Sequence, residues 1–167
     1  MSKHHKILLP PPILPEDIEP VNLLLKVTPL KVLPNGNLED KNEDFSNSYL
    51  KNINIHTILF ITAGNYLKNN HVLLRLYEQG NNCLLIPGSM AEVLRMFSAA
   101  GFIQIHDSYS INKNFAVSVS PHFEINLLDF DLPLPIGRFY SEKVDKVLFP
   151  KSTCHYGKSC PNNKSVI

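Results

Sequence analysis

Charge is scarce in this sequence of 167 residues. Only 19% of the residues are charged, which is below the usual quarter of a globular protein, and the formal net charge is +1. This balance argues against a surface that follows nucleic-acid phosphates, while it leaves a local basic patch open. We therefore expect no specific DNA binding.

Long apolar runs and cysteines are also few. No run approaches the roughly 20 apolar residues that a membrane-spanning helix needs. Prolines interrupt the apolar run near the N-terminus before it reaches the length of a signal-peptide core. The three cysteines are an odd number and do not indicate a disulfide framework. We expect a reducing compartment, the cytoplasm or the nucleus, and no membrane partner.

The familiar motifs of catalysis are missing as well. The sequence has no Gly-rich phosphate loop, no Gly-x-Ser-x-Gly and no His-Glu-x-x-His. Carboxylates concentrate at Glu39, Asp40, Glu43 and Asp44, in a polar linker where a run of charge is typical of a solvated segment. Cys83 precedes an apolar run and is expected to be a small buried residue. We expect no enzymatic activity and no catalytic residue.

What is present divides the chain into four parts. Residues 1–20 are rich in proline, which favours an extended tail. Residues 21–48 hold an apolar segment and a polar linker. Residues 49–149 are expected to form one globular domain, and residues 150–167 a tail that contains two cysteines.

A capping box gives the clearest local signal. In "IPGSMAEVLRMFSAAGF", Ser89 is a candidate N-cap and Glu92 follows three positions later. Apolar residues then recur at helical spacing until Gly101, which suits a left-handed C-cap. The pattern predicts a helix over residues 90–100, and the alternation that follows predicts a β-hairpin within residues 102–120.

The apolar spacing of residues 49–79 favours helices. The β-branched residues of 55–62 leave a strand open there. Helices followed by a small antiparallel sheet predict an α+β fold class, with extended proline-rich tails.

Residues 57–119 resemble the PUB domain, the peptide:N-glycanase/UBX-associated module. The segment "ITAGNYLKN" places Asn65 at an asparagine of the family pattern, and "LLRLYEQGN" places Arg75 and Asn81 at its arginine and second asparagine. The helix that ends in Gly-Phe and the strand-like "FAVSVS" follow in the order of the family.

The PUB resemblance implies a non-catalytic adaptor that binds a short peptide in an apolar cleft. The implied partner is the C-terminal tail of the AAA ATPase valosin-containing protein. Asn65, Tyr66, Arg75 and Asn81 are the implied peptide-binding residues. The alternatives are a helix-end cap for Asn65 and an ordinary surface charge for Arg75.

The segment "KSTCHYGKSC" is similar to the start of the poly(ADP-ribose)-binding zinc finger. That pattern is matched by Lys151, Cys154, Tyr156, Gly157 and Cys160. Two thiolates at this spacing can reach one zinc ion, but a structural zinc site needs four ligands. Cys154 and Cys160 are therefore candidate metal ligands of an incomplete finger, with a flexible tail or an oxidative disulfide as alternatives; no other cofactor is expected.

Three functional hypotheses follow. The first is the PUB-like adaptor. The second is a nuclear DNA-damage factor that binds poly(ADP-ribose). Its zinc finger would be completed in a longer form of the protein. The third is a structural subunit whose proline-rich ends wrap a partner, because extended apolar segments rarely stay free in water.

Overall fold

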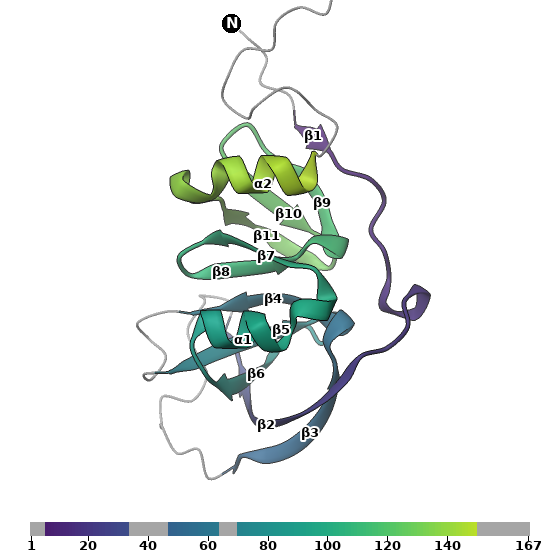
Figure 1. Ribbon diagram of the computed structural model, residues 1–167, viewed down its shortest axis with the longest axis vertical. Coiled ribbons are helices and arrows are strands. Elements are labelled where there is room, and N and C mark those ends of the chain that lie inside the picture. The colour runs from purple at the N-terminus through teal and green to yellow at the C-terminus, as the bar shows by residue number, and fades with distance from the viewer. Residues whose placement is uncertain (1–5, 34–46, 64–69, 150–167) are drawn as a thin grey trace, which may run out of the picture.

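The structure is a computed structural model that describes residues 6–33, 47–63 and 70–149. Over these residues the fold is mainly β, with two antiparallel sheets and two short helices (Figure 1). Within the same ranges no helix is long and apolar enough to cross a membrane.

The larger sheet has seven strands in the order β3-β2-β6-β5-β4-β8-β7. In chain order they are β2 (Asn22–Lys31), β3 (Tyr49–Asn54), β4 (Ile58–Thr62), β5 (His71–Leu76), β6 (Asn82–Pro87), β7 (Phe102–His106) and β8 (Tyr109–Asn112). β4 lies between β5 and β8, and all of its side chains are buried. β4 therefore contributes to the cores on both faces of the sheet.

The smaller sheet has four strands in the order β1-β9-β10-β11. They are β1 (Ile7–Leu8), β9 (Ala116–Val119), β10 (Glu124–Leu127) and β11 (Phe130–Pro135). The N-terminal segment continues along this sheet, since the Leu9 amide donates to the Val117 carbonyl and the Ile13 amide to that of Asn114, both at 2.9 Å.

Two hydrophobic cores hold these layers together. In the first, α1 (Met90–Met96) packs on the larger sheet, with Val93 and Phe97 fully buried against residues such as Ile61 and Leu74. The second core joins β4, β7 and β8 to the smaller sheet, and α2 (Ser141–Leu148) covers it with Val144.

The predicted helix over residues 90–100 is confirmed. α1 begins after Ser89, whose hydroxyl accepts the Glu92 amide while the Glu92 carboxylate accepts the Ser89 amide. A 3-10 turn, Ser98–Ala100, extends it to Gly101, which has a φ of 67° in the left-handed region. The hairpin is also confirmed as β7 paired with β8.

The α+β fold class is wrong. Residues 49–79 form β3, β4 and β5 in place of helices. The physical reason is visible in β4, where burial of both faces removes the alternation by which a strand is normally detected. The four-part division of the chain stays a prediction, although residues 7–8 and 22–31 contribute strands to the two sheets.

Candidate functional site

Arg138 and Phe139 are exposed to solvent in the segment that joins β11 to α2. They belong to a 3-10 turn, Arg138–Tyr140, that follows Gly137. Arg138 is exposed, and Phe139 is 95% exposed, the most of the large hydrophobic residues described. Phe139 therefore contributes nothing to core packing, while aromatic and arginine side chains are the groups that most often anchor an interface.

A close backbone contact fixes this turn. The Gly137 amide donates to the Ile105 carbonyl of β7 at 2.7 Å, and the Tyr140 amide donates to the Gly137 carbonyl at 2.9 Å. A side chain at Gly137 would meet Tyr140 Cδ2 at 3.0 Å and His106 Cδ2 at 3.4 Å. Close packing of the two rings therefore favours glycine here, whereas its φ of −67° is ordinary and makes no such demand.

The turn between β7 and β8 lies beside it and is polar. The Ser108 amide donates to Nδ1 of His106 at 3.1 Å, so the neutral imidazole carries its proton on Nε2. The Tyr140 hydroxyl donates to Oδ1 of Asp107 at 2.7 Å, which joins the two turns. This hydrogen bond is the main cause that raises the pKa of Tyr140 above its usual range. We call residues 106–108 and 137–140 the paired-turn surface.

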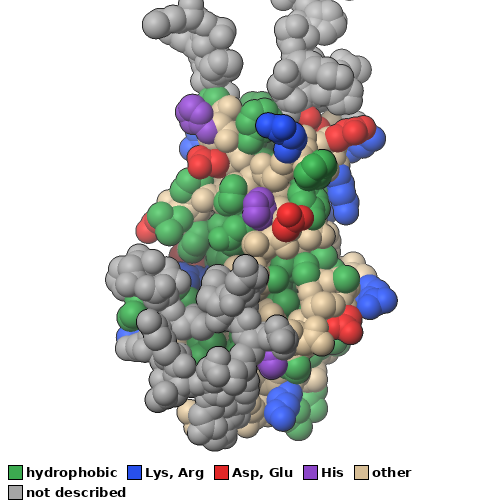
Figure 2. Space-filling view, turned by 90° about the vertical axis from the view of Figure 1, so that its left-hand side faces the viewer, with side chains coloured by type: hydrophobic (Ala, Val, Ile, Leu, Met, Phe, Trp, Pro, Cys, Tyr) green, Lys and Arg blue, Asp and Glu red, His purple; other side chains and the backbone are tan. Residues whose placement is uncertain are grey.

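The charge around the paired-turn surface is mixed. Arg138 and Lys143 are exposed cations, and Asp107 and Glu142 are exposed anions. Glu142 forms an ion pair with Lys146 at 2.8 Å on α2. Figure 2 likewise shows charges of both signs scattered among hydrophobic and uncharged groups. The surface therefore presents no field of a single sign.

The predicted peptide-binding residues fall into two groups. Asn65 and Tyr66 lie outside the described residues. Arg75 and Asn81 do meet: Nη2 of Arg75 donates to Oδ1 of Asn81 at 3.2 Å. The guanidinium of Arg75 also lies 5.2 Å from the centre of the Phe130 ring, so Arg75 links β5 to β11 within the chain.

The candidate zinc ligands Cys154 and Cys160 also lie outside the described residues. Among the residues that are described, no three His, Cys, Asp or Glu side chains gather in a way that could hold a metal ion. Cys83 is buried, as expected, and burial raises the pKa of its thiol, opposed by the nearby Arg75.

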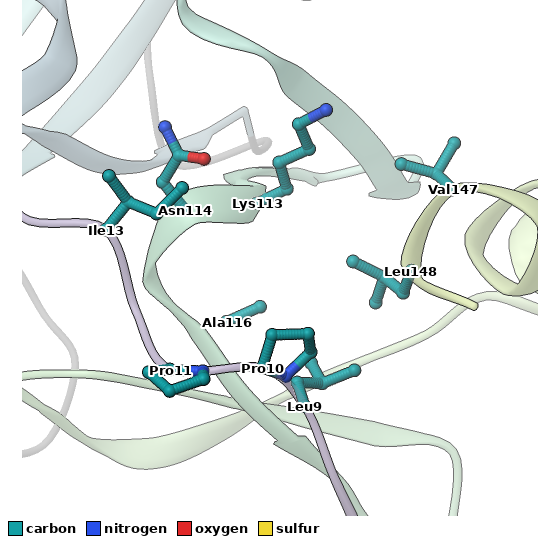
Figure 3. A pocket seen from close by; sticks show the side chains of 9 residues that line it. All are labelled: Leu9, Pro10, Pro11, Ile13, Lys113, Asn114, Ala116, Val147 and Leu148. Atoms are coloured by element: carbon teal, nitrogen blue, oxygen red, sulfur yellow. The ribbon is translucent and has the colours of Figure 1, made fainter. Parts of the chain in front are cut away.

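A small groove lies at the other end of α2 (Figure 3). Its volume is about 150 Å³, and it lies between the N-terminal segment, the start of β9 and the last residues of α2. Most of its lining is apolar: Leu9, Pro10, Pro11, Ile13, Ala116, Val147 and Leu148, with Lys113 and Asn114 at its edge. In Figure 3 the amino group of Lys113 points away from the hollow, so no polar groups converge in it.

Comparison with known proteins shows the fold. No family model and no curated protein matches the sequence. A solved structure does match: the LytTr DNA-binding domain of a putative methyl-accepting/DNA response regulator from Bacillus cereus. The match has a TM-score of 0.50 at 17% identity, and covers 74% of this chain and 97% of that one. The fold is LytTr-like.

The LytTr-like fold overturns the PUB resemblance and what it implied. The described residues within 57–119, where the PUB resemblance implies helices, contain β4 to β9 and one α-helix, α1. The adaptor function, the peptide-type partner valosin-containing protein and the expected absence of DNA binding are corrected with it. The shared signals were a helix cap and a Gly-Phe, which are local and occur in unrelated folds.

Sequence reasoning missed the paired-turn surface. Residues 106–108 belong to the turn of the predicted hairpin, and no motif covers residues 137–140. The hydrogen bond between Tyr140 and Asp107 spans 33 positions of sequence, so no local pattern predicts it. The one signal was Arg138 next to Phe139 directly before a helix.

Proposed function

We propose that this protein binds duplex DNA through the paired-turn surface and catalyses no reaction. The observation that carries the proposal is the exposed Arg138–Phe139 pair, held rigidly against a polar turn. The fold supports it, because the solved structure it resembles is described as a DNA-binding domain.

The groups on this surface suit the edges of base pairs. An arginine can donate two hydrogen bonds to O6 and N7 of guanine in the major groove, and apolar side chains contact the thymine methyl group. Arg138 and Phe139 supply these two chemistries next to each other. The Nε2–H of His106 and the hydroxyl of Ser108 add donors on the neighbouring turn.

The mixed charge predicts how DNA would be held. Arg138 is assigned to a base, so Lys143 is the exposed cation next to this surface that is left for the backbone, and we expect about one phosphate contact. The logarithm of the association constant then falls with the logarithm of salt concentration with a slope near −1, far shallower than for a protein with many phosphate contacts. Sequence selectivity would come from base contacts. This role also requires a compartment that contains DNA, the cytoplasm or the nucleus.

A selection experiment tests the proposal. The full chain is incubated with random-sequence duplexes at about 50 mM salt, bound duplexes are enriched over several rounds, and the affinity of the best site is measured by fluorescence anisotropy. We expect a defined sequence to be enriched and Arg138→Ala to weaken binding to it by about tenfold. If the wild-type chain enriches no sequence and binds no duplex, the proposal is wrong.

A further inference from the structure

We propose that Asp107 is a specificity residue that selects a cytosine in the bound DNA. The inference rests on the proposed function, and it concerns the one exposed anion within the paired-turn surface. A carboxylate is a poor group for a surface that only attracts phosphates, since it repels them. Its position on this surface, bonded to Tyr140, therefore points to a different use.

The carboxylate of Asp107 is fixed in direction. Oδ1 accepts the Tyr140 hydroxyl at 2.7 Å, and the Tyr140 ring lies against Gly137, where the two turns touch. An ionised carboxylate has about four lone-pair sites, and the hydroxyl occupies one of them. Because Asp107 is exposed, the remaining acceptor capacity faces solvent.

A fixed acceptor discriminates among bases. In the major groove, cytosine presents its N4 amino group as a donor, and Asp or Glu accepts from it. Guanine O6 and N7 and thymine O4 are acceptors, and adenine sets its N7 acceptor beside its N6 donor, so all three would bring an acceptor against the carboxylate with like partial charge. Such a mismatch removes water from the carboxylate and gives it no hydrogen bond in return. The affinity for a duplex with the wrong base is therefore lower.

Asp107 and Arg138 together offer the bases complementary hydrogen-bonding groups, an acceptor and a donor. The acceptor of one turn suits the cytosine of a G·C pair, and the donor of the other turn suits a guanine. The Tyr140 hydroxyl contacts Asp107 directly, and His106 and Ser108 are its neighbours along the chain. Repulsion of phosphates by Asp107 also lowers binding to sequences that lack the matching bases.

Three variants separate this role from a merely structural one. Asp107→Asn keeps an oxygen that accepts the Tyr140 hydroxyl but removes the charge and adds a donor. Asp107→Ala removes the hydrogen bond as well. Tyr140→Phe loses the hydrogen bond and keeps the carboxylate. It therefore measures how much the base preference depends on the hydrogen bond that orients Asp107.

The test repeats the random-duplex selection with the wild-type chain and each variant, with urea unfolding to verify that they are folded. We expect the wild type to prefer cytosine at one position by roughly tenfold. Asp107→Asn should lose that preference while its affinity for random DNA rises. Tyr140→Phe should keep the preference in weakened form.

Two results would overturn the inference in distinguishable ways. If the wild type enriches a sequence and Asp107→Asn enriches the same one with the same base preferences, Asp107 does not select cytosine, while DNA binding stands. If neither the wild type nor any variant enriches a sequence, DNA binding itself fails and this inference fails with it.

Discussion

The residues that flank α1 and α2, the two α-helices in the described part of the chain, have opposite roles. At α1, the capping box of Ser89 and Glu92 satisfies the first amides, and Gly101 follows in the left-handed conformation after the last turn. At α2, no side chain caps the N-terminus, and the residues before it, Arg138 and Phe139, face water.

The residues around α1 therefore contribute to stability, and the turn before α2 contributes to recognition. The polar groups that cap α1 bond to each other, and its residues Met90 and Val93 lie in the first core with Phe97. The turn before α2 is anchored by its backbone, through Gly137, and by the Tyr140 hydroxyl, which leaves the side chains of Arg138 and Phe139 exposed. A rigid backbone with unused side chains is the arrangement that a binding surface needs.

The largest expected effect contrasts two phenylalanines. Phe97→Ala removes a side chain that is fully buried in the first core and should lower the free energy of unfolding by about 3–5 kcal/mol. Phe139→Ala removes one that is 95% exposed and should change it by less than about 0.5 kcal/mol. Urea unfolding measures both. Comparable losses would mean that Phe139 is packed in solution and is not part of an open surface.

The second prediction contrasts two exposed arginines. Arg138→Ala should weaken binding to the selected duplex by about 1–3 kcal/mol, because a bidentate contact to guanine is lost. Arg95→Ala, on the exposed face of α1, is the matched control and should leave affinity nearly unchanged. Anisotropy titrations at a fixed salt concentration compare the two. Equal losses would indicate a general effect of charge.

The third prediction concerns the caps. Ser89→Ala should lower the free energy of unfolding by about 1 kcal/mol, because it removes the acceptor of the Glu92 amide. Ser141→Ala should have a smaller effect, since its hydroxyl donates to the Arg138 carbonyl and caps no helix amide. If thermal unfolding ranks the two in reverse, the contrast between the helices is wrong.

The fourth and smallest effect depends on pH. Hydrogen bonds from the Ser89 amide and hydroxyl hold the pKa of Glu92 below its ordinary value of 4.5. A lowered folded-state pKa means that this stabilisation is present above pH 4.5 and is lost as pH falls through the lowered value. Between pH 6 and pH 3 the wild type should therefore lose more thermal stability than Glu92→Gln. Parallel curves for the two proteins would contradict this.

The same contrast shows what the sequence predicts. α1 and its cap were predictable because all of their signals lie within residues 88–101. β4 was predictable only as the strand that its β-branched residues left open within 55–62, because its short apolar run is buried on both faces and lacks the alternation of a half-buried strand. The zinc ligands proposed at Cys154 and Cys160 stay a prediction, as those residues lie outside the described ranges.

The paired-turn surface could not be predicted for a different reason. It exists only because the Gly137 amide reaches the Ile105 carbonyl, a contact between distant parts of the chain. The near-neutral charge argues against a broad phosphate-binding face, but it does not exclude a surface that reads bases with few charges.

The most direct test is to locate the DNA contact on the protein. Amide chemical shifts of ¹⁵N-labelled protein would be followed by NMR during titration with the selected duplex at about 50 mM salt. The account predicts that the largest changes fall at residues 106–108 and 137–140, with α1 little affected. Changes centred on Arg75 and Asn81, or on the groove at the far end of α2, would contradict it.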